Sequence, residues 1–138
     1  MSKSQEGKTA QGSLWGARFS AGPSPELARL SRSTHFDWQL AAYDLAGSRA
    51  HAKALAAAGY LTPVELATMT DAVARLETAV ADGSFQALDT DEDVHAALER
   101  GIIEFAGAEV GGKLRAGRSR NDQIATLIRL YLLDHASV

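Results

Sequence analysis

The residues best suited to chemistry lie between Gly111 and Arg129, where the sequence reads GGKLRAGRSRNDQIATLIR. Four basic residues fall within eight positions of this run: Lys113, Arg115, Arg118 and Arg120. Three glycines give the backbone unusual freedom, and the Ser-Arg-Asn-Asp run at 119–122 contains residue types that cap helix N-termini. We therefore expect a flexible cationic loop that leads into a helix. Unpaired N–H groups and the positive end of the helix dipole would gather there, which predicts an anion site.

Two other interpretations of this run are possible. Gly107 to Lys113 spells the G-x-x-x-x-G-K of a phosphate loop, but Leu114 stands where a hydroxyl would bind Mg²⁺, and the preceding pattern is helical rather than a strand. A solvated basic loop without a ligand is the interpretation that composition alone favours. The choice between an anion site and a solvated loop therefore depends on other parts of the sequence.

A second cluster of ionisable residues, DEDVHAALER, spans Asp91 to Arg100. A metal could be held by His95 with Glu99 or Asp91, but one histidine among scattered acids lacks a ligand set, so we expect no metal. The acids around His95 are better suited to holding the arginines of the cationic loop by charge-assisted hydrogen bonds. Arg118, Asp93 and His95 are therefore expected to shape the site rather than to transfer protons.

These strings together resemble a known family. GGKLRAGRSRNDQIATLIRLYL is similar to the first conserved region of the argininosuccinate lyases, members of the fumarase/aspartase superfamily. SLWGARF at 13–19, residues 31–50 and DEDVHAALER match the same family. The resemblance covers about residues 13–133, and the combination of GRSRNDQ with DEDVH is specific, although neither string alone would be.

The resemblance implies reversible cleavage of argininosuccinate to L-arginine and fumarate, in arginine biosynthesis and without a cofactor. Ser119, Arg120 and Asn121 match the Ser-Arg-Asn triplet that binds the succinate carboxylates in this family. Ser33 matches a serine that contacts the substrate, although Ser33 and Thr34 could equally cap the next helix. The strings that carry the family's Thr/His pair and its catalytic serine do not occur here. We therefore expect no catalytic residue in this chain and no activity of the chain alone.

The same resemblance implies the domain organisation. We expect a disordered tail at 1–12, an N-terminal helical domain at 13–110, and at 111–138 the substrate-binding loop with the start of a central bundle helix. Such bundles join the subunits of a homotetramer. Two alternatives remain: an inactive truncated module that docks with full-length lyase subunits, or a superfamily lyase acting on adenylosuccinate or fumarate. GRSRNDQ and DEDVH favour argininosuccinate.

Composition excludes several classes of protein. A net charge of −3 argues against nucleic-acid binding, and no apolar run approaches the ~20 residues of a membrane helix. The chain has no cysteine, which fits a reducing compartment. Its polar N-terminus has no apolar segment typical of a secretion signal. We therefore expect a cytoplasmic protein, and the resemblance implies that its partners are a small dicarboxylate substrate and other subunits.

Apolar spacing and capping residues predict an all-α fold. Helices are expected near residues 24–31, 37–58, 63–82, 91–106 and 121–138, with bounds uncertain by about two to four residues. Thr62 to Glu65 reads as a capping box. The last helix should bury Ile124, Leu127, Ile128, Tyr131 and Leu132 against partners, and should present an unpaired apolar face when those partners are absent.

Overall fold

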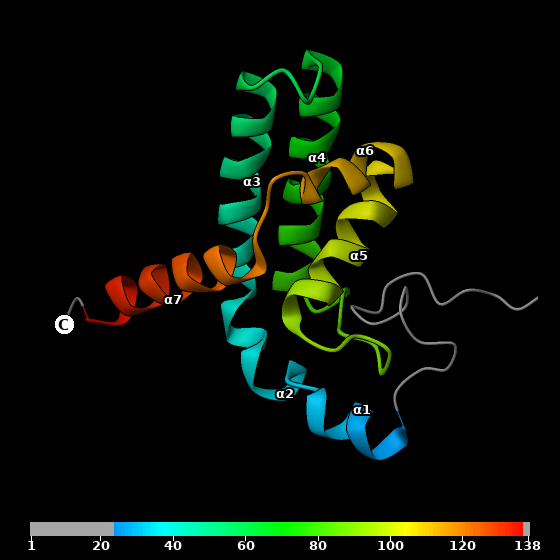
Figure 1. Cartoon of the computed structure of the whole chain (residues 1–138), viewed down its shortest axis with the longest axis vertical. Coiled ribbons are helices and arrows are strands. Elements are labelled where there is room, and N and C mark those ends of the chain that lie inside the picture. The colour runs from blue at the N-terminus through cyan, green and yellow to red at the C-terminus, as the bar shows by residue number, and fades with distance from the viewer. Residues whose placement is uncertain (1–23, 137–138) are drawn as a thin grey trace, which may run out of the picture. The chain divides into compact units, whose positions relative to one another are not determined.

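The computed structural model describes residues 24–136. The chain divides into two compact units, residues 1–31 and residues 32–138. All regular elements in the described range are helical, which confirms the predicted all-α class (Figure 1). They are α1 (Pro25–Ser31), α2 (Thr34–Asp37), a 3₁₀ turn (Trp38–Leu40), α3 (Ala41–Ala57), α4 (Pro63–Ala81), α5 (Val94–Ala106), α6 (Ala108–Gly112), a second 3₁₀ turn (Lys113–Arg115) and α7 (Arg120–Ala136). The predicted tail at 1–12 and the 13–19 string lie outside the described residues.

The first unit contributes one short described helix, α1. Ser24 caps it as expected, because its Oγ accepts a hydrogen bond from the Leu27 N–H at 3.2 Å. Leu27 and Leu30 are 53% and 84% exposed. The predicted helix at 24–31 is therefore confirmed as a separate element, and the helix that follows in sequence belongs to the second unit.

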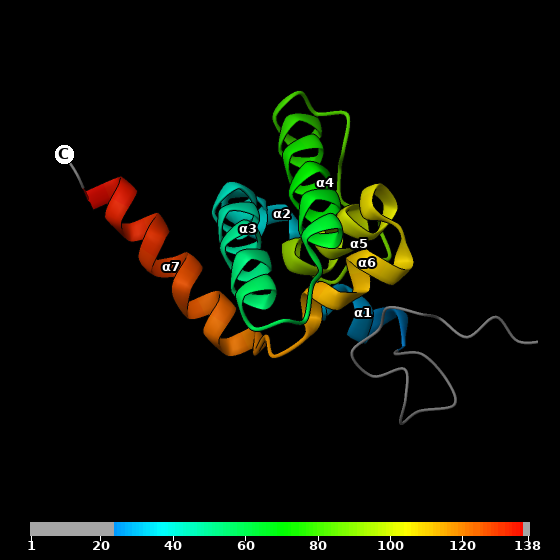
Figure 2. The ribbon, with the colours of Figure 1, turned by 90° about the horizontal axis from the view of Figure 1, so that it is seen from above.

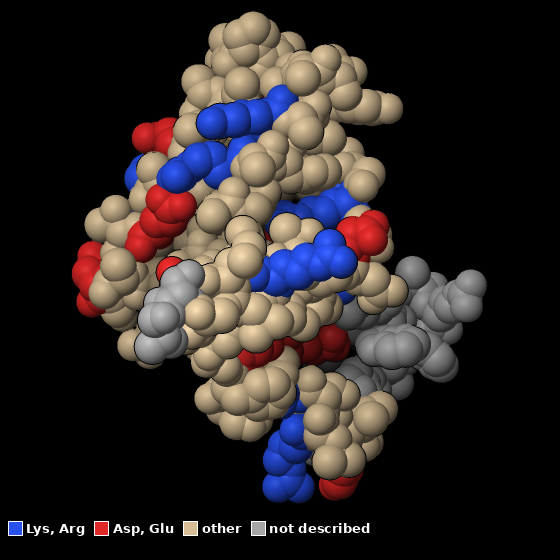
Figure 3. Space-filling model, turned by 90° about the vertical axis from the view of Figure 1, so that its left-hand side faces the viewer, with Lys and Arg blue, Asp and Glu red and all other residues tan. Residues whose placement is uncertain are grey.

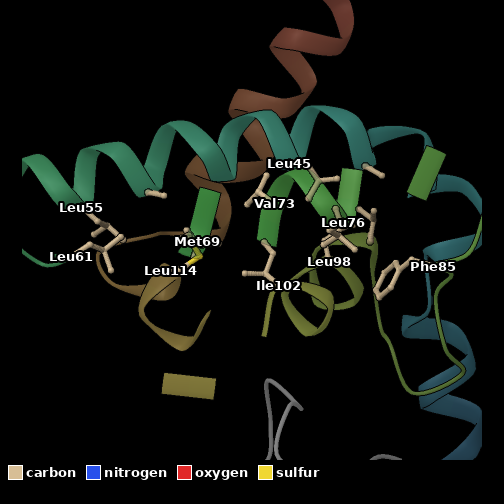
Figure 4. Packing of buried hydrophobic residues seen from close by; sticks show 13 residues of the cluster. Leu45, Leu55, Leu61, Met69, Val73, Leu76, Phe85, Leu98, Ile102 and Leu114 are labelled. Carbon is tan, nitrogen blue, oxygen red and sulfur yellow. The ribbon is translucent and has the colours of Figure 1, made fainter. Parts of the chain in front are cut away.

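In the second unit, α3 and α4 run side by side and α5 packs against α4 (Figures 1 and 2). The apolar stripe of α4 enters the core as its spacing predicts, with Met69, Val73 and Leu76 fully buried. Val94, Leu98 and Ile102 of α5 belong to the same buried cluster, and Figure 4 shows Leu98 and Ile102 beside the buried side chains of α4. This apolar core fixes α3 and α5, the two helices that supply the buried polar groups described below.

The capping box of α4 is confirmed. The Glu65 N–H donates to the Thr62 Oγ1 at 3.2 Å, and the Thr62 N–H donates to the Glu65 Oε2 at 2.8 Å. Two N–H groups that a helix N-terminus would leave unpaired are thereby satisfied. The helix α5 starts three residues later than expected, at Val94, because Asp93 is its N-cap and accepts from the Ala96 N–H at 2.7 Å.

The predicted flexible loop is partly wrong. Residues 111–115 are helical, within α6 and the second 3₁₀ turn. Two of them, Gly111 and Leu114, pack against other parts of the second unit. Leu114 is only 3% exposed, and Gly111 is buried against α5, where an added Cβ would lie 2.8 Å from the Ile103 Cα. The irregular part of the run is confined to residues 116–119, which join the 3₁₀ turn to α7.

The last helix, α7, packs mainly on α3 and extends away from α4 (Figure 2). Leu127 of the predicted apolar face is buried, whereas Ile128 and Leu132 are 45% and 55% exposed. Among the described residues this face is therefore partly uncovered, as the sequence predicts when partner helices are absent. No helix within residues 24–136 combines the length and apolar character needed to cross a membrane.

Candidate functional site

A hollow of about 200 Å³ lies where the segment 116–119 meets α3 and the first turns of α7. The residues that line it come from α3 and from the stretch 117–127, which is far from α3 in sequence: Gly47, His51, Gly117, Arg118, Ser119, Asp122, Gln123, Thr126 and Leu127. Gly117 has a φ of 63°, a conformation that favours glycine. The turn at Gly117 therefore brings the chain into α7 at the edge of this hollow.

Ser119 and the N-terminus of α7 form the polar end of the hollow. The Ser119 carbonyl accepts the first hydrogen bond of the helix, from the Gln123 N–H at 3.0 Å. The N–H groups of the first turn have no partner inside the helix, and the helix dipole is positive at this end. The backbone therefore presents positive partial charge at this end of the hollow, which the acid Asp122 also lines.

Arg118 does not point into solvent, although it belongs to the cationic run. Its side chain is 15% exposed. Its Nη2 lies 3.0 Å from the Asp44 Oδ1, and its Nη1 donates to the Ser48 Oγ at 2.9 Å. Arg118 is thus held by α3, and its charge is largely committed to Asp44.

Asp44 is the centre of a buried polar cluster. Its Oδ2 lies 2.6 Å from the His95 Nδ1, and both side chains are almost fully buried. The Gln123 Nε2 donates to both of its oxygens, at 2.8 and 2.9 Å. Burial alone would raise the pKa of the Asp44 carboxyl, but the interactions with His95, Arg118 and Gln123 outweigh burial and hold this pKa below its ordinary value. Asp44 is therefore a buried carboxylate anion.

The acids near His95 do only part of what the sequence predicts. Glu99 pairs with Arg115 at 3.2 Å, which confirms one predicted contact with the cationic run. Asp91 binds Arg100 at 2.9 Å. Asp93 caps α5. Asp44, for which local sequence patterns predict no role, holds Arg118 and His95.

Two further contacts hold the cationic run. The Lys113 ammonium pairs with Glu65 of α4, and the His51 Nε2 lies 3.0 Å from the Ala116 carbonyl oxygen. On the described part of the face toward which α7 extends, basic side chains are interspersed with acidic and uncharged ones (Figure 3). Lys113, Arg115 and Arg118 are therefore anchored to acids of α4, α5 and α3, and the Ala116 carbonyl is bound by His51 of α3.

Arg120 and Asn121 differ from Arg118 and Gln123, which lie on either side of them in sequence. Neither side chain has a hydrogen bond or ion pair to any residue within 24–136. Arg120 is half-buried and Asn121 is exposed. Their donors are thus available to a ligand, whereas those of Arg118 and Gln123 are used within the chain.

Ser33 lies at the start of α2, outside the residues that line the hollow. Its Oγ donates to the buried Asp37 Oδ2 at 2.5 Å, and that oxygen also accepts from the Val94 N–H at 3.2 Å. Ser33 occupies the N-cap position of α2, but its side chain makes no capping bond. The structure therefore brings Ser119 to the hollow with Arg118, and it does not place Ser33 in contact with Arg120 or Asn121.

The Lys113–Glu65 pair makes a prediction about acid stability. The hydrogen bond from Lys113, with those from Thr62, lowers the pKa of Glu65 from 4.5 to about 2. A depressed folded-state pKa means that the unfolded chain binds more protons between these values, so the pair's contribution is full above about pH 4.5 and is lost toward pH 2. Urea unfolding from pH 5 to 2 should show a shallower loss of stability in Glu65→Gln than in the unmodified chain. Lys113→Met should reproduce most of the change, and equal pH slopes in all three proteins would contradict the assignment.

Comparison with known proteins identifies the family. The model of a family described as "Lyase" matches residues 18–138. The chain belongs to the lyase family. The match includes all of the second unit and therefore every residue of the hollow, the Asp44 cluster and the Ser119–Asn121 run.

Individual relatives within this lyase family carry a more specific name. The argininosuccinate lyase of Leifsonia xyli subsp. xyli is 74% identical over 132 residues, covering 96% of this chain and 28% of that protein. The argininosuccinate lyase of Clavibacter michiganensis is 67% identical over 127 residues, or 92% and 26% of the two chains. That of Streptomyces coelicolor is 64% identical over 123 residues, or 89% and 26%. The predicted resemblance is confirmed, and the chain spans about a quarter of the length of these relatives.

Proposed function

We propose that this chain is part of an argininosuccinate lyase, which cleaves argininosuccinate reversibly to L-arginine and fumarate, and that it supplies the carboxylate-binding segment of the active site. The observation that carries the proposal is the 74% identity to the Leifsonia xyli argininosuccinate lyase over 96% of the chain. Because the chain spans only 28% of that protein, the activity is proposed for the full-length lyase and not for the 138 residues alone.

The geometry at the start of α7 suits the binding half of this reaction. Elimination removes a proton next to a carboxylate, and negative charge develops there in the transition state. The Arg120 guanidinium can donate two parallel hydrogen bonds to one carboxylate, and the Asn121 amide and Ser119 hydroxyl can donate to another. Since Arg120 and Asn121 have no partner among the described residues, they need not break an internal contact to bind substrate.

Proton transfer is assigned to other parts of the full-length lyase. His95 is 5% exposed and contacts Asp44 and Gln123, so we propose a supporting role for it and for Asp93 and Arg118. The family resemblance implies that the proton-transferring residues come from further segments and from neighbouring subunits of a homotetramer. The exposed Ile128 and Leu132 of α7 support the proposal that residues 111–138 contain the substrate-binding loop and the start of a bundle helix. A cytoplasmic location is part of the same proposal.

A chimera tests this function. In it, the present chain replaces the matching segment of the Leifsonia xyli lyase, and fumarate formation from argininosuccinate is followed by ultraviolet absorbance. We expect turnover close to that of the parent lyase, no turnover with adenylosuccinate or with fumarate and ammonia, and none from the 138-residue chain alone. A well-folded chimera that does not cleave argininosuccinate would refute the proposal, and turnover of adenylosuccinate would support the alternative superfamily lyase.

A further inference from the structure

One carboxylate contacts both sides of the proposed binding run. Asp44 of α3 is 1% exposed. It binds Arg118, which comes directly before Ser119, and it binds Gln123, which comes two residues after Asn121. Arg118 and Gln123 flank the segment 119–122 and both bind the Asp44 carboxylate, from which they are 74 and 79 residues away in sequence. The segment is therefore held at both ends.

The contacts of α3 come from one face of that helix. Asp44, Ser48 and His51 follow each other at intervals of four and three residues, which places them on neighbouring turns of the same face. Ser48 shares the Arg118 guanidinium with Asp44, and His51 holds the Ala116 carbonyl. The entry of the chain into α7 is thus fixed at three points against a helix that is itself anchored in the apolar core.

Net stability is a weak explanation for this arrangement. The cost of removing a carboxylate and a guanidinium from water offsets most of their mutual attraction, so buried ion pairs contribute little net stability. What the pair does provide is direction, because the planar guanidinium and the amide of Gln123 can meet the Asp44 oxygens in few geometries. His95 occupies the remaining side of the carboxylate from α5, which limits rotation of the Asp44 side chain.

We propose that Asp44 is a positioning residue for the substrate-binding run: by holding Arg118 and Gln123, it fixes the orientation in which Ser119, Arg120 and Asn121 meet the substrate. The inference rests on the proposed lyase function. Asp44 itself is buried and touches no substrate. Its effect is on the orientation of donors, and misplacement of a binding group by about 1 Å can reduce a rate about a hundredfold.

The test uses Asp44→Asn in the chimera, which keeps the shape of the side chain and removes its charge. We expect kcat/KM for argininosuccinate to fall about a hundredfold. The matched control is Asp71→Asn, which removes an exposed acid of α4 whose one ion pair within residues 24–136, to Arg75, spans 3.7 Å. This control should stay within about twofold of the unmodified chimera. The unmodified chimera is assayed first, so failure of the lyase function is distinguished from failure of the inference.

Amide hydrogen exchange distinguishes positioning from general destabilisation. Loss of positioning should accelerate exchange of the first hydrogen-bonded amides of α7, at residues 123–127, while α4 remains protected, whereas general destabilisation accelerates exchange in both. A folded Asp44→Asn chimera with kcat/KM within twofold of the parent, or with exchange raised equally in α4, would overturn the inference. If Asp44→Asn does not fold, Gln123→Met is measured in the same way. This substitution leaves Asp44 paired with Arg118 and His95. It is expected to lose about tenfold in kcat/KM with the same local increase in exchange, and unchanged values would overturn the inference as well.

Discussion

Replacing Arg120 by alanine in the chimera is expected to lower kcat/KM for argininosuccinate by roughly 10- to 150-fold, with little effect on folding. A hydrogen bond to a charged group contributes about 1.5–3 kcal/mol, and about 1.4 kcal/mol corresponds to a factor of ten. Arg120 has no partner among the described residues, so its removal breaks no contact within the second unit. The loss should therefore appear in steady-state kinetics and not in the melting temperature.

The matched control is Arg129→Ala. Arg129 lies on the same helix, is exposed, and makes no ion pair to any residue in the described range. Its loss should change kcat/KM by less than about twofold, as expected for a surface charge. Asn121→Ala should fall between the two. If Arg120→Ala and Arg129→Ala show the same kinetics as the unmodified chimera, the Ser119–Asn121 run does not bind the substrate.

Local signals in the sequence were sufficient to predict most helices. The helix α4 has a capping box at Thr62 and an apolar residue every three or four positions, and it forms at Pro63–Ala81 against a prediction of 63–82. Its buried residues Met69, Val73 and Leu76 follow each other at intervals of four and three positions. Such features depend on neighbours within one helical turn, which is why a single sequence is enough to predict them.

The wrong predictions concern features that depend on tertiary contacts. Glycine density around Gly111 suggested a flexible loop, but the run is helical as far as Arg115 because Gly111 packs against Ile103 and Leu114 is buried. The helix predicted at 37–58 also differs: Asp37 is the last residue of α2, a 3₁₀ turn spans Trp38–Leu40, and α3 begins at Ala41. There the Asp37 carboxylate is engaged by Ser33 and by the distant Val94 N–H.

The candidate site was only partly predictable for the same reason. The basic run and the capping residues at 119–122 are neighbours in sequence, so they indicate the candidate anion site without information on tertiary contacts. Asp44, in contrast, acts on residues more than 70 positions away. A signal for it was present: Asp44 and His95 are ionisable residues on the apolar faces of α3 and α5, beside Leu45 and Leu98. Ionisable residues at buried positions need a partner, but a single sequence does not show which residues form the pair.

The second large effect is expected at Gly111. A Cβ at this position would lie 2.8 Å from the Ile103 Cα and 3.2 Å from its backbone nitrogen. Because those atoms belong to the backbone of α5, they cannot move aside as the end of a flexible side chain would. Gly111→Ala should therefore destabilise the chain by about 1–3 kcal/mol, even though helix propensity alone favours alanine by about 1 kcal/mol. Urea unfolding of the 138-residue chain measures the change.

Gly112 provides the matched control, since it is the next residue of α6 and its added Cβ would meet nothing within 4 Å. Gly112→Ala should leave stability unchanged or raise it by up to about 1 kcal/mol. A loss of stability at Gly111 and a gain at Gly112 can arise only from packing, because the reduced backbone flexibility of alanine would affect both positions alike. In the chimera, Gly111→Ala should also lower kcat/KM, since α6 leads into the segment that positions Arg118 and Ser119. If both alanine variants stabilise the chain, Gly111 is not a close contact between α6 and α5, and the basic run is more mobile than its helical structure indicates.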